Sequence, residues 1–128
     1  LTKDLWDCST NPTKAKYVAE SLVATWTASQ ELSNIIGAKF TAVLQPVIYA
    51  GKASVHKTID NHSSSKMLKK QFEIVYPLID EYAKKANINY VNMTSVYDGC
   101  NDCYFDFCHV GPKAHKILAK EMNKFANN

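Results

Sequence analysis

Arginine is absent from the 128-residue sequence, and all fifteen basic residues are lysines. Proteins that bind nucleic acids usually hold phosphates and base edges with the planar guanidinium fork of arginine, so this composition argues against that class. The net charge of +3 is mild, and most of the lysines are scattered along the chain. We therefore expect no nucleic-acid partner.

Long apolar runs are absent as well. No run of about 18 apolar residues occurs, so the sequence predicts no transmembrane segment. Residues 1–7 have neither the basic start nor the apolar stretch of a signal peptide, and the first residue is not methionine. From this beginning we expect a mature or truncated chain. Apolar residues make up 46% of the sequence, which is enough for the core of one domain.

The cysteine content is small but even, with Cys8, Cys100, Cys103 and Cys108. Four cysteines permit two disulfides in three possible pairings, of which we favour Cys8 with Cys108 and Cys100 with Cys103. Two sequons, Asn61-His-Ser63 and Asn92-Met-Thr94, also suit an exported protein. We therefore expect a secreted or periplasmic location.

The late cysteines, together with His109, also invite a zinc interpretation. Cys108 and His109 are adjacent, however, and we expect strain if both bind one ion. A second Cys-x-x-Cys pair is absent. The sequence therefore predicts neither a metal nor another cofactor.

Local signals predict three helices and two strands. Asn11-Pro12 is typical of a helix start and Gly37 of a helix end, so a helix is expected between them. Residues 39–45 and 88–93 are β-prone, and helices are expected over about 65–86 and from Pro112 onward. Pro77 should kink or interrupt the second helix near Tyr76. The apolar spacing predicts a core made of Ala15, Val18, Ala19, Leu22, Val23, Trp26, Ile35 and Ile36, then Leu68, Phe72, Val75, Ile79, Tyr82 and Ala83, and finally Ala114, Ile117, Leu118, Met122 and Phe125.

The alternation of helices and strands favours an α/β fold with a parallel sheet covered by helices. Two strands make a poor sheet, because a domain of this kind normally holds about five. We therefore expect that the chain is the later part of a fold whose central strands lie elsewhere.

Asp106 and His109 are the strongest candidates for chemistry. They stand three residues apart in a loop that leads, through Gly111-Pro112, into an amphipathic helix. A carboxylate that holds one imidazole nitrogen leaves the other nitrogen free to accept a proton from a hydroxyl nucleophile. We expect Tyr104, Phe105 and Phe107 to bury the surroundings of the carboxylate. The alternative is that the pair serves the structure alone, as a hydrogen-bonded helix start.

The segment from Tyr104 to Ala119 resembles the last sequence block of the SGNH (GDSL-type) esterase and lipase family, in which an Asp-x-x-His pair precedes the C-terminal helix. Residues 7–12 with the helix that follows, and the run from Gly37 to Pro46, are similar to the middle of such hydrolases. The resemblance covers about residues 5–125.

The resemblance implies a three-layer α/β/α, flavodoxin-like fold, with residues 1–128 as the C-terminal part of one hydrolase domain. It implies that Asp106 and His109 are the acid and base of a Ser-His-Asp triad in an acyl ester hydrolase. The family's Gly-Asp-Ser block, its oxyanion-hole glycine and its Gly-x-Asn-Asp block have no match here, and Asn101-Asp102 is similar only in letters. We therefore expect an N-terminal segment of the same protein to supply the nucleophile, and a small-molecule, carbohydrate or lipid ester as the substrate. The alternative is a non-catalytic domain of the same fold that binds carbohydrate or protein.

Other residues have weaker claims to a role. Gln45 ends a strand at the edge where open α/β sheets bind ligands, so it is a candidate substrate-binding residue, although a packing role is equally compatible. His56 and His62 lie in a long predicted loop and are either surface residues or substrate contacts. His115 is expected to face solvent.

Overall fold

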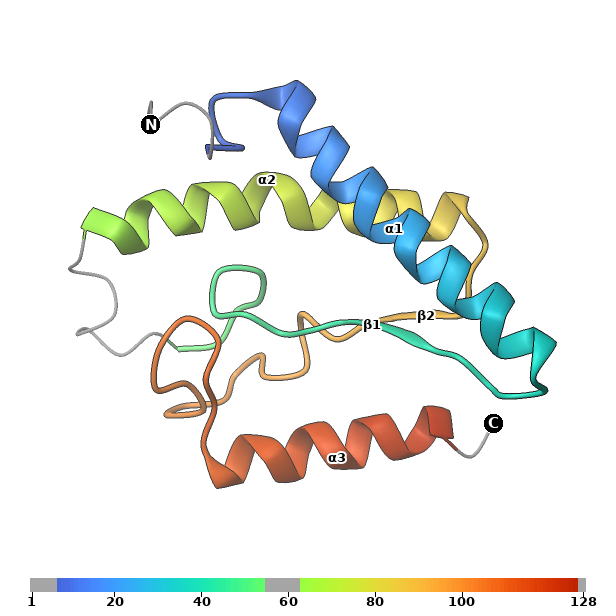
Figure 1. Ribbon diagram of the computed structural model, residues 1–128. Coiled ribbons are helices and arrows are strands. Elements are labelled where there is room, and N and C mark those ends of the chain that lie inside the picture. The colour runs from blue at the N-terminus through green and yellow to red at the C-terminus, as the bar shows by residue number, and fades with distance from the viewer. Residues whose placement is uncertain (1–6, 55–62, 127–128) are drawn as a thin grey trace. The chain divides into compact units, whose positions relative to one another are not determined.

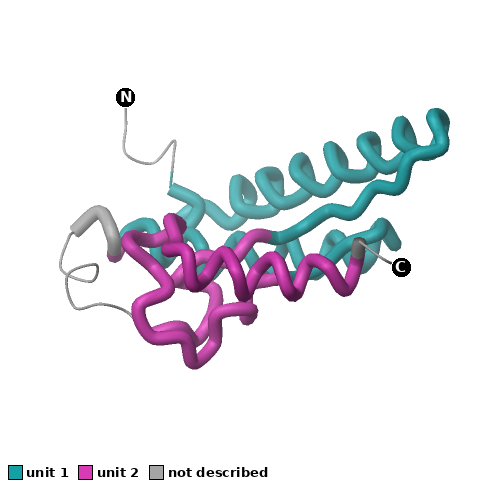
Figure 2. The backbone as a smooth tube through the Cα atoms, turned by 90° about the horizontal axis from the view of Figure 1, so that it is seen from below, with its two compact units in different colours: residues 1–44, 67–92 teal, residues 45–66, 93–128 magenta. Residues whose placement is uncertain are grey.

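The computed structural model describes residues 7–54 and 63–126. In chain order its elements are α1 (Pro12–Ile35), β1 (Ala42–Leu44), α2 (Ser63–Lys85), β2 (Tyr90–Asn92) and α3 (Pro112–Ala126) (Figure 1). This order confirms the predicted alternation and a mixed α/β fold with a parallel sheet. Among the described residues, no helix is both long enough and apolar enough to cross a bilayer. The chain divides into unit 1, residues 1–44 and 67–92, and unit 2, residues 45–66 and 93–128 (Figure 2).

Both ends of α1 are set by local sequence, as predicted. The side chain of Asn11 accepts a hydrogen bond from the Lys14 amide at 3.0 Å, and Pro12 occupies the first turn, where a missing N–H costs nothing. At the other end Gly37 has φ +71°, in the left-handed region that glycine enters without a steric cost. The amides of Gly37 and Ala38 then donate to the carbonyls of Asn34 and Ser33, which ends the helix in a Schellman motif.

The two strands pair in parallel, and each has three residues. The register joins Ala42 to Tyr90, Val43 to Val91, and Leu44 to Asn92. Both strands are shorter than the sequence predicted. One reason lies at the start of the ladder, where the side-chain amide of Asn89 donates to the carbonyl of Phe40 at 2.6 Å. A side chain therefore binds the backbone there in place of a strand partner.

The second helix is continuous through Pro77, so the predicted interruption near Tyr76 is wrong, whereas the alternative of a kink stays a prediction (Figure 1). Proline removes one hydrogen bond to the carbonyl four residues earlier, here that of Glu73. Pro77 and Glu73 are both exposed, so water can reach this carbonyl. Val75 and Ile79 are buried on the other face of the same turn, and their packing stabilises the helix across the proline.

In unit 1, α1 and α2 pack against the sheet and lie on the same side of it (Figure 1). The buried residues of this core are Cys8, Ala15, Ala19, Val23, Leu44, Val75, Ile79 and Ala83, with Leu22, Trp26, Tyr76, Leu78, Tyr82, Ile88 and Tyr90 partly buried against them. Val18 is exposed, and Ile35 and Ile36 are each 79% exposed, so their predicted burial is wrong. The core ends near Trp26, and the last turns of α1 extend beyond it.

Unit 2 has a separate core, formed by two loops and the start of α3. Its buried members are Ile48, Tyr97, Cys100, Cys103, Tyr104 and Ala114, and Ile117 and Leu118 are partly buried against them. Met122 and Phe125 are exposed, which contradicts their predicted burial. The reason is that the core of this unit reaches along α3 only to Leu118.

Candidate active site

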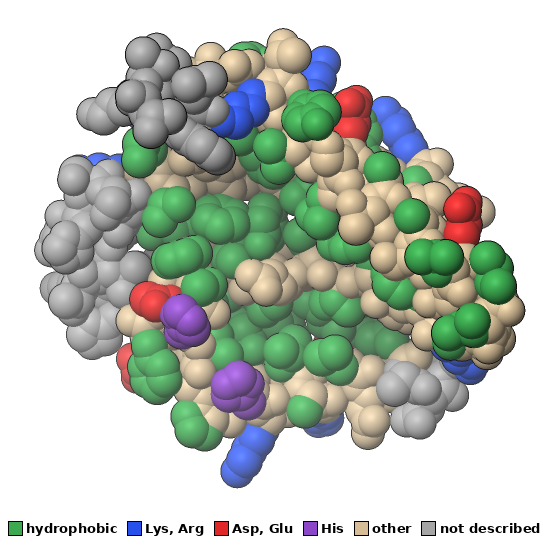
Figure 3. All heavy atoms as spheres, in the orientation of Figure 1, with side chains coloured by type: hydrophobic (Ala, Val, Ile, Leu, Met, Phe, Trp, Pro, Cys, Tyr) green, Lys and Arg blue, Asp and Glu red, His purple; other side chains and the backbone are tan. Residues whose placement is uncertain are grey.

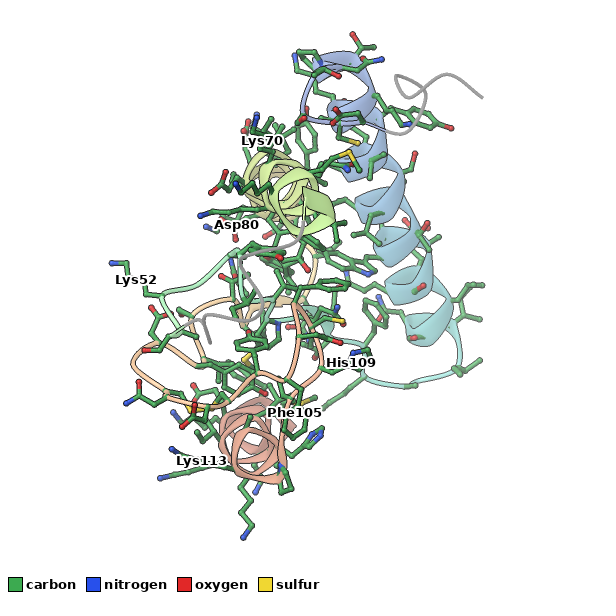
Figure 4. All side chains as sticks on the ribbon, turned by 90° about the vertical axis from the view of Figure 1, so that its left-hand side faces the viewer. Lys52, Lys70, Asp80, Phe105, His109 and Lys113 are labelled. Atoms are coloured by element: carbon green, nitrogen blue, oxygen red, sulfur yellow. A yellow bond between two sulfur atoms is a disulfide. The ribbon has the colours of Figure 1, made fainter. Side chains whose placement is uncertain are left out.

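The loop that precedes α3 is closed on itself by backbone hydrogen bonds. Tyr104 and Val110 form an antiparallel bridge, and the amide of Phe105 donates to the carbonyl of His109 at 2.8 Å. At the base of the loop, the amide of Gly111 donates to the carbonyl of Cys103 at 3.0 Å. Figure 4 labels Phe105 and His109 on this loop. Residues 105–109 are therefore held as a tight turn at the start of the last helix.

The carboxylate of Asp106 is the centre of that turn. Its Oδ1 accepts hydrogen bonds from the amides of Cys108, at 2.9 Å, and His109, at 2.7 Å. Its Oδ2 lies 2.6 Å from Nδ1 of the His109 ring. One oxygen thus fixes the backbone, and the other fixes the imidazole.

These hydrogen bonds also fix the charge of the carboxylate. The amides of His109 and Cys108, followed by the His109 side chain, hold the pKa of Asp106 well below its usual range. An ionised carboxylate can only accept, so it favours the tautomer of His109 that carries its proton on Nδ1. Nε2 of that tautomer has a free lone pair and can accept a proton.

The pair is more exposed than the sequence predicted. The His109 side chain is 75% exposed and the Asp106 side chain 48%. Tyr104 is buried in the core of unit 2, and Phe107 is partly buried against that core. Phe105 is 70% exposed, so the three aromatic residues do not enclose the carboxylate. The described histidines lie at the molecular surface (Figure 3). Water therefore screens the interaction between Asp106 and His109, which is weaker than in a buried triad.

Cys108, which is adjacent to His109 in the sequence, is also a neighbour of its ring in the structure. Its Sγ lies 3.8 Å from Nδ1 of His109. Partial burial, and then the negative charge and hydrogen bonding of Asp106, raise the pKa of the thiol. The adjacency of Cys108 and His109 in the sequence is the signal for this contact.

The predicted disulfide between Cys100 and Cys103 is present. Cys8, in unit 1, and Cys108, in unit 2, have free thiols. The predicted bond between Cys8 and Cys108 is therefore not present in this structure.

The other candidate residues are not part of the contact between Asp106 and His109. Gln45 is exposed directly after β1, and its role in binding substrate stays a prediction. His115 is exposed on α3, as expected. His56 and His62 lie outside the described residues.

Comparison with known proteins adds no relative. No protein-family model, curated protein or solved structure matches the chain.

Proposed function

We propose that this chain is the C-terminal part of a serine ester hydrolase of the SGNH type. In this proposal His109 is the general base and Asp106 orients it. A serine hydroxyl from a segment of the protein outside this sequence is the nucleophile. The domain then has the three-layer α/β/α, flavodoxin-like architecture of that family, in which the two observed strands are part of a larger parallel sheet.

The observation that carries this proposal is the 2.6 Å contact between Oδ2 of Asp106 and Nδ1 of His109, on a carboxylate whose other oxygen is fixed by two backbone amides. The two amides, of Cys108 and His109, hold the turn before α3, and this turn does not need an imidazole. The added contact is what a general base requires, because it sets the tautomer and the direction of the ring. The exposure of His109 leaves its ring accessible to a substrate and to a second polypeptide segment.

The reaction follows from this arrangement. As the serine oxygen attacks the ester carbonyl, Nε2 of His109 accepts the hydroxyl proton, and Asp106 stabilises the imidazolium that forms. His109 then returns the proton to the departing alcohol, which leaves an acyl-enzyme. Water hydrolyses the acyl-enzyme with His109 again acting as the base.

The test is hydrolysis of a short-chain aryl ester by the protein expressed from its complete coding sequence. His109→Ala and Asp106→Asn should each lower kcat by about 10⁴-fold, since removing one member of a triad costs that much. His115→Ala is the matched control, because it removes another exposed imidazole close by in the sequence. Equal turnover by the wild type and His109→Ala would eliminate the proposal.

A second candidate function is favoured by the exposed ring of Phe105, on the same turn as His109. An exposed aromatic ring suits a non-catalytic domain of the same fold that binds carbohydrate or a protein, since such rings are common anchors in binding surfaces. Under this alternative, Phe105→Ala abolishes binding to immobilised glycans or to a partner, and His109→Ala leaves that binding intact.

A further inference from the structure

The loop before α3 brings three different metal-binding side chains together. One ligand atom from each of Asp106, Cys108 and His109 lies within 4.8 Å of the other two. The thiol of Cys108 is free, and all three side chains are at least partly exposed. Sulfur, nitrogen and oxygen donors therefore meet at one accessible point.

From this cluster we propose a site for Zn²⁺ with Sγ of Cys108, Nδ1 of His109 and Oδ2 of Asp106 as ligands. Thiolate and imidazole donors suit zinc, whereas Mg²⁺ and Ca²⁺ require oxygen donors. Three protein ligands leave the fourth tetrahedral position open to water, as in zinc sites that are accessible to solvent.

The observed distances are close to those of a zinc site. With ordinary zinc bond lengths, tetrahedral coordination separates nitrogen and sulfur ligands by about 3.5 Å, and nitrogen and oxygen ligands by about 3.3 Å. Here Sγ of Cys108 is 3.8 Å from Nδ1 of His109, and Nδ1 is 2.6 Å from Oδ2 of Asp106. Small rotations of the side chains shorten the distance from Sγ to Nδ1 and lengthen that from Nδ1 to Oδ2. The adjacency of Cys108 and His109 is therefore no obstacle to their binding one ion.

Backbone hydrogen bonds hold the Asp106 carboxylate in place for this site. Oδ1 of Asp106 accepts hydrogen bonds from the amides of Cys108 and His109, so the carboxylate keeps its position when Oδ2 binds the ion. Such outer hydrogen bonds orient metal ligands and contribute to affinity.

The proton balance of binding is simple. The Cys108 thiol releases its proton to solvent, and the His109 proton moves from Nδ1 to Nε2 through water, so one proton leaves for each ion bound. The thiolate and the Asp106 carboxylate together neutralise the two charges of Zn²⁺. On the hydrolase function proposed above, the zinc-bound form is inactive, because Nε2 then carries a proton and cannot act as the base.

The test is metal binding to the same full-length protein, measured by calorimetry with Zn²⁺ and by absorption spectroscopy with Co²⁺. We expect one Zn²⁺ per chain at this site, no binding of Mg²⁺, and a thiolate-to-cobalt charge-transfer band. Cys108→Ser should abolish the band and weaken zinc binding at least about tenfold, and Asp106→Asn should weaken it by a similar factor. His115→Ala and Cys8→Ser, which remove an exposed imidazole and the other free thiol, should change neither readout.

Two results would overturn the site: unchanged zinc affinity in Cys108→Ser, or loss of the charge-transfer band in Cys8→Ser. Neither readout depends on ester hydrolysis, so failure of the proposed enzyme activity and failure of the zinc site are separate outcomes.

Discussion

Tyr97 and Tyr90 allow the same small substitution to be tested with opposite expected signs. Tyr97 is 1% exposed, and its ring packs edge-on against Tyr104 with the centroids 5.4 Å apart. Its hydroxyl oxygen is buried and has no hydrogen-bond partner within the part of the chain that the structure describes. Tyr90 differs, because its hydroxyl donates to Oδ1 of Asp80 at 3.0 Å.

The magnitudes follow from these two environments. Burying a hydroxyl without a hydrogen bond costs about 1–3 kcal/mol, and Tyr97→Phe removes that cost while keeping the ring. The small space left by the lost oxygen offsets part of the gain, so we expect the free energy of unfolding to rise by about 1 kcal/mol. Tyr90→Phe removes a hydrogen bond to a carboxylate, and we expect the free energy of unfolding to fall by about 1.5–3 kcal/mol.

Urea denaturation followed by circular dichroism measures both changes. The two tyrosines lie in different units, so any separate unfolding transitions would each report on one substitution. The slope of the free energy of unfolding against urea concentration should stay the same, because neither substitution appreciably alters the surface area exposed on unfolding. If Tyr97→Phe lowers stability by as much as Tyr90→Phe, the Tyr97 hydroxyl is hydrogen-bonded in the folded protein, and the reasoning fails.

Three further variants test the packing, the electrostatics and the disulfide. Gly51→Ala places a Cβ atom 2.5 Å from the carbonyl oxygen of Thr94, so it should cost about 1–3 kcal/mol in urea denaturation. Burial raises the pKa of Asp80, but hydrogen bonds from Lys84, Asn92 and Tyr90 outweigh it and lower the pKa below the ordinary 3.8. Its stabilising effect is therefore complete above about pH 4 and is lost as the pH falls through the lowered value. Asp80→Asn should cost about 1.5–3 kcal/mol at pH 7 and flatten the dependence of thermal stability on pH below about pH 4. Replacing Cys100 and Cys103 by serine should cost about 2 kcal/mol, the entropy of so short a loop, in thermal unfolding.

Each of these predictions can fail in a specific way. Unchanged stability in Gly51→Ala would mean that the backbone of the loop moves to accept a methyl group. If the thermal stability of Asp80→Asn depends on pH in the same way as that of the wild type, other carboxylates control acid unfolding. A chemically reduced wild-type protein provides the control for the double serine variant, and the two should unfold at the same temperature.

The features that the sequence predicted well are those set by neighbouring residues. Asn11, Pro12 and Gly37 act within one turn of α1, so the bounds of that helix could be predicted without tertiary information. The close approach of Asp106 and His109 has the same local origin, since both lie in one hydrogen-bonded turn.

The features that the sequence did not predict depend on distant residues. Whether Pro77 breaks α2 is decided by the packing of Val75 and Ile79 in unit 1, and the length of β1 depends on its partner strand and on Asn89. The exposure of Phe105 follows from a bridge that turns Tyr104 into the core of unit 2 and leaves the next side chain outside. Periodicity along one helix or strand contains none of this information.

The bridge between Tyr104 and Val110 means that the acid and the imidazole are assembled by a few consecutive residues rather than by the fold as a whole. Such a motif is portable: a cyclised peptide of residues 103–111 should retain the short contact between Asp106 and His109 in solution. An acid–imidazole pair that one short turn holds together can be retained when residues are inserted or lost elsewhere in a protein. The same turn could also be transplanted to another scaffold that presents a hydroxyl opposite it.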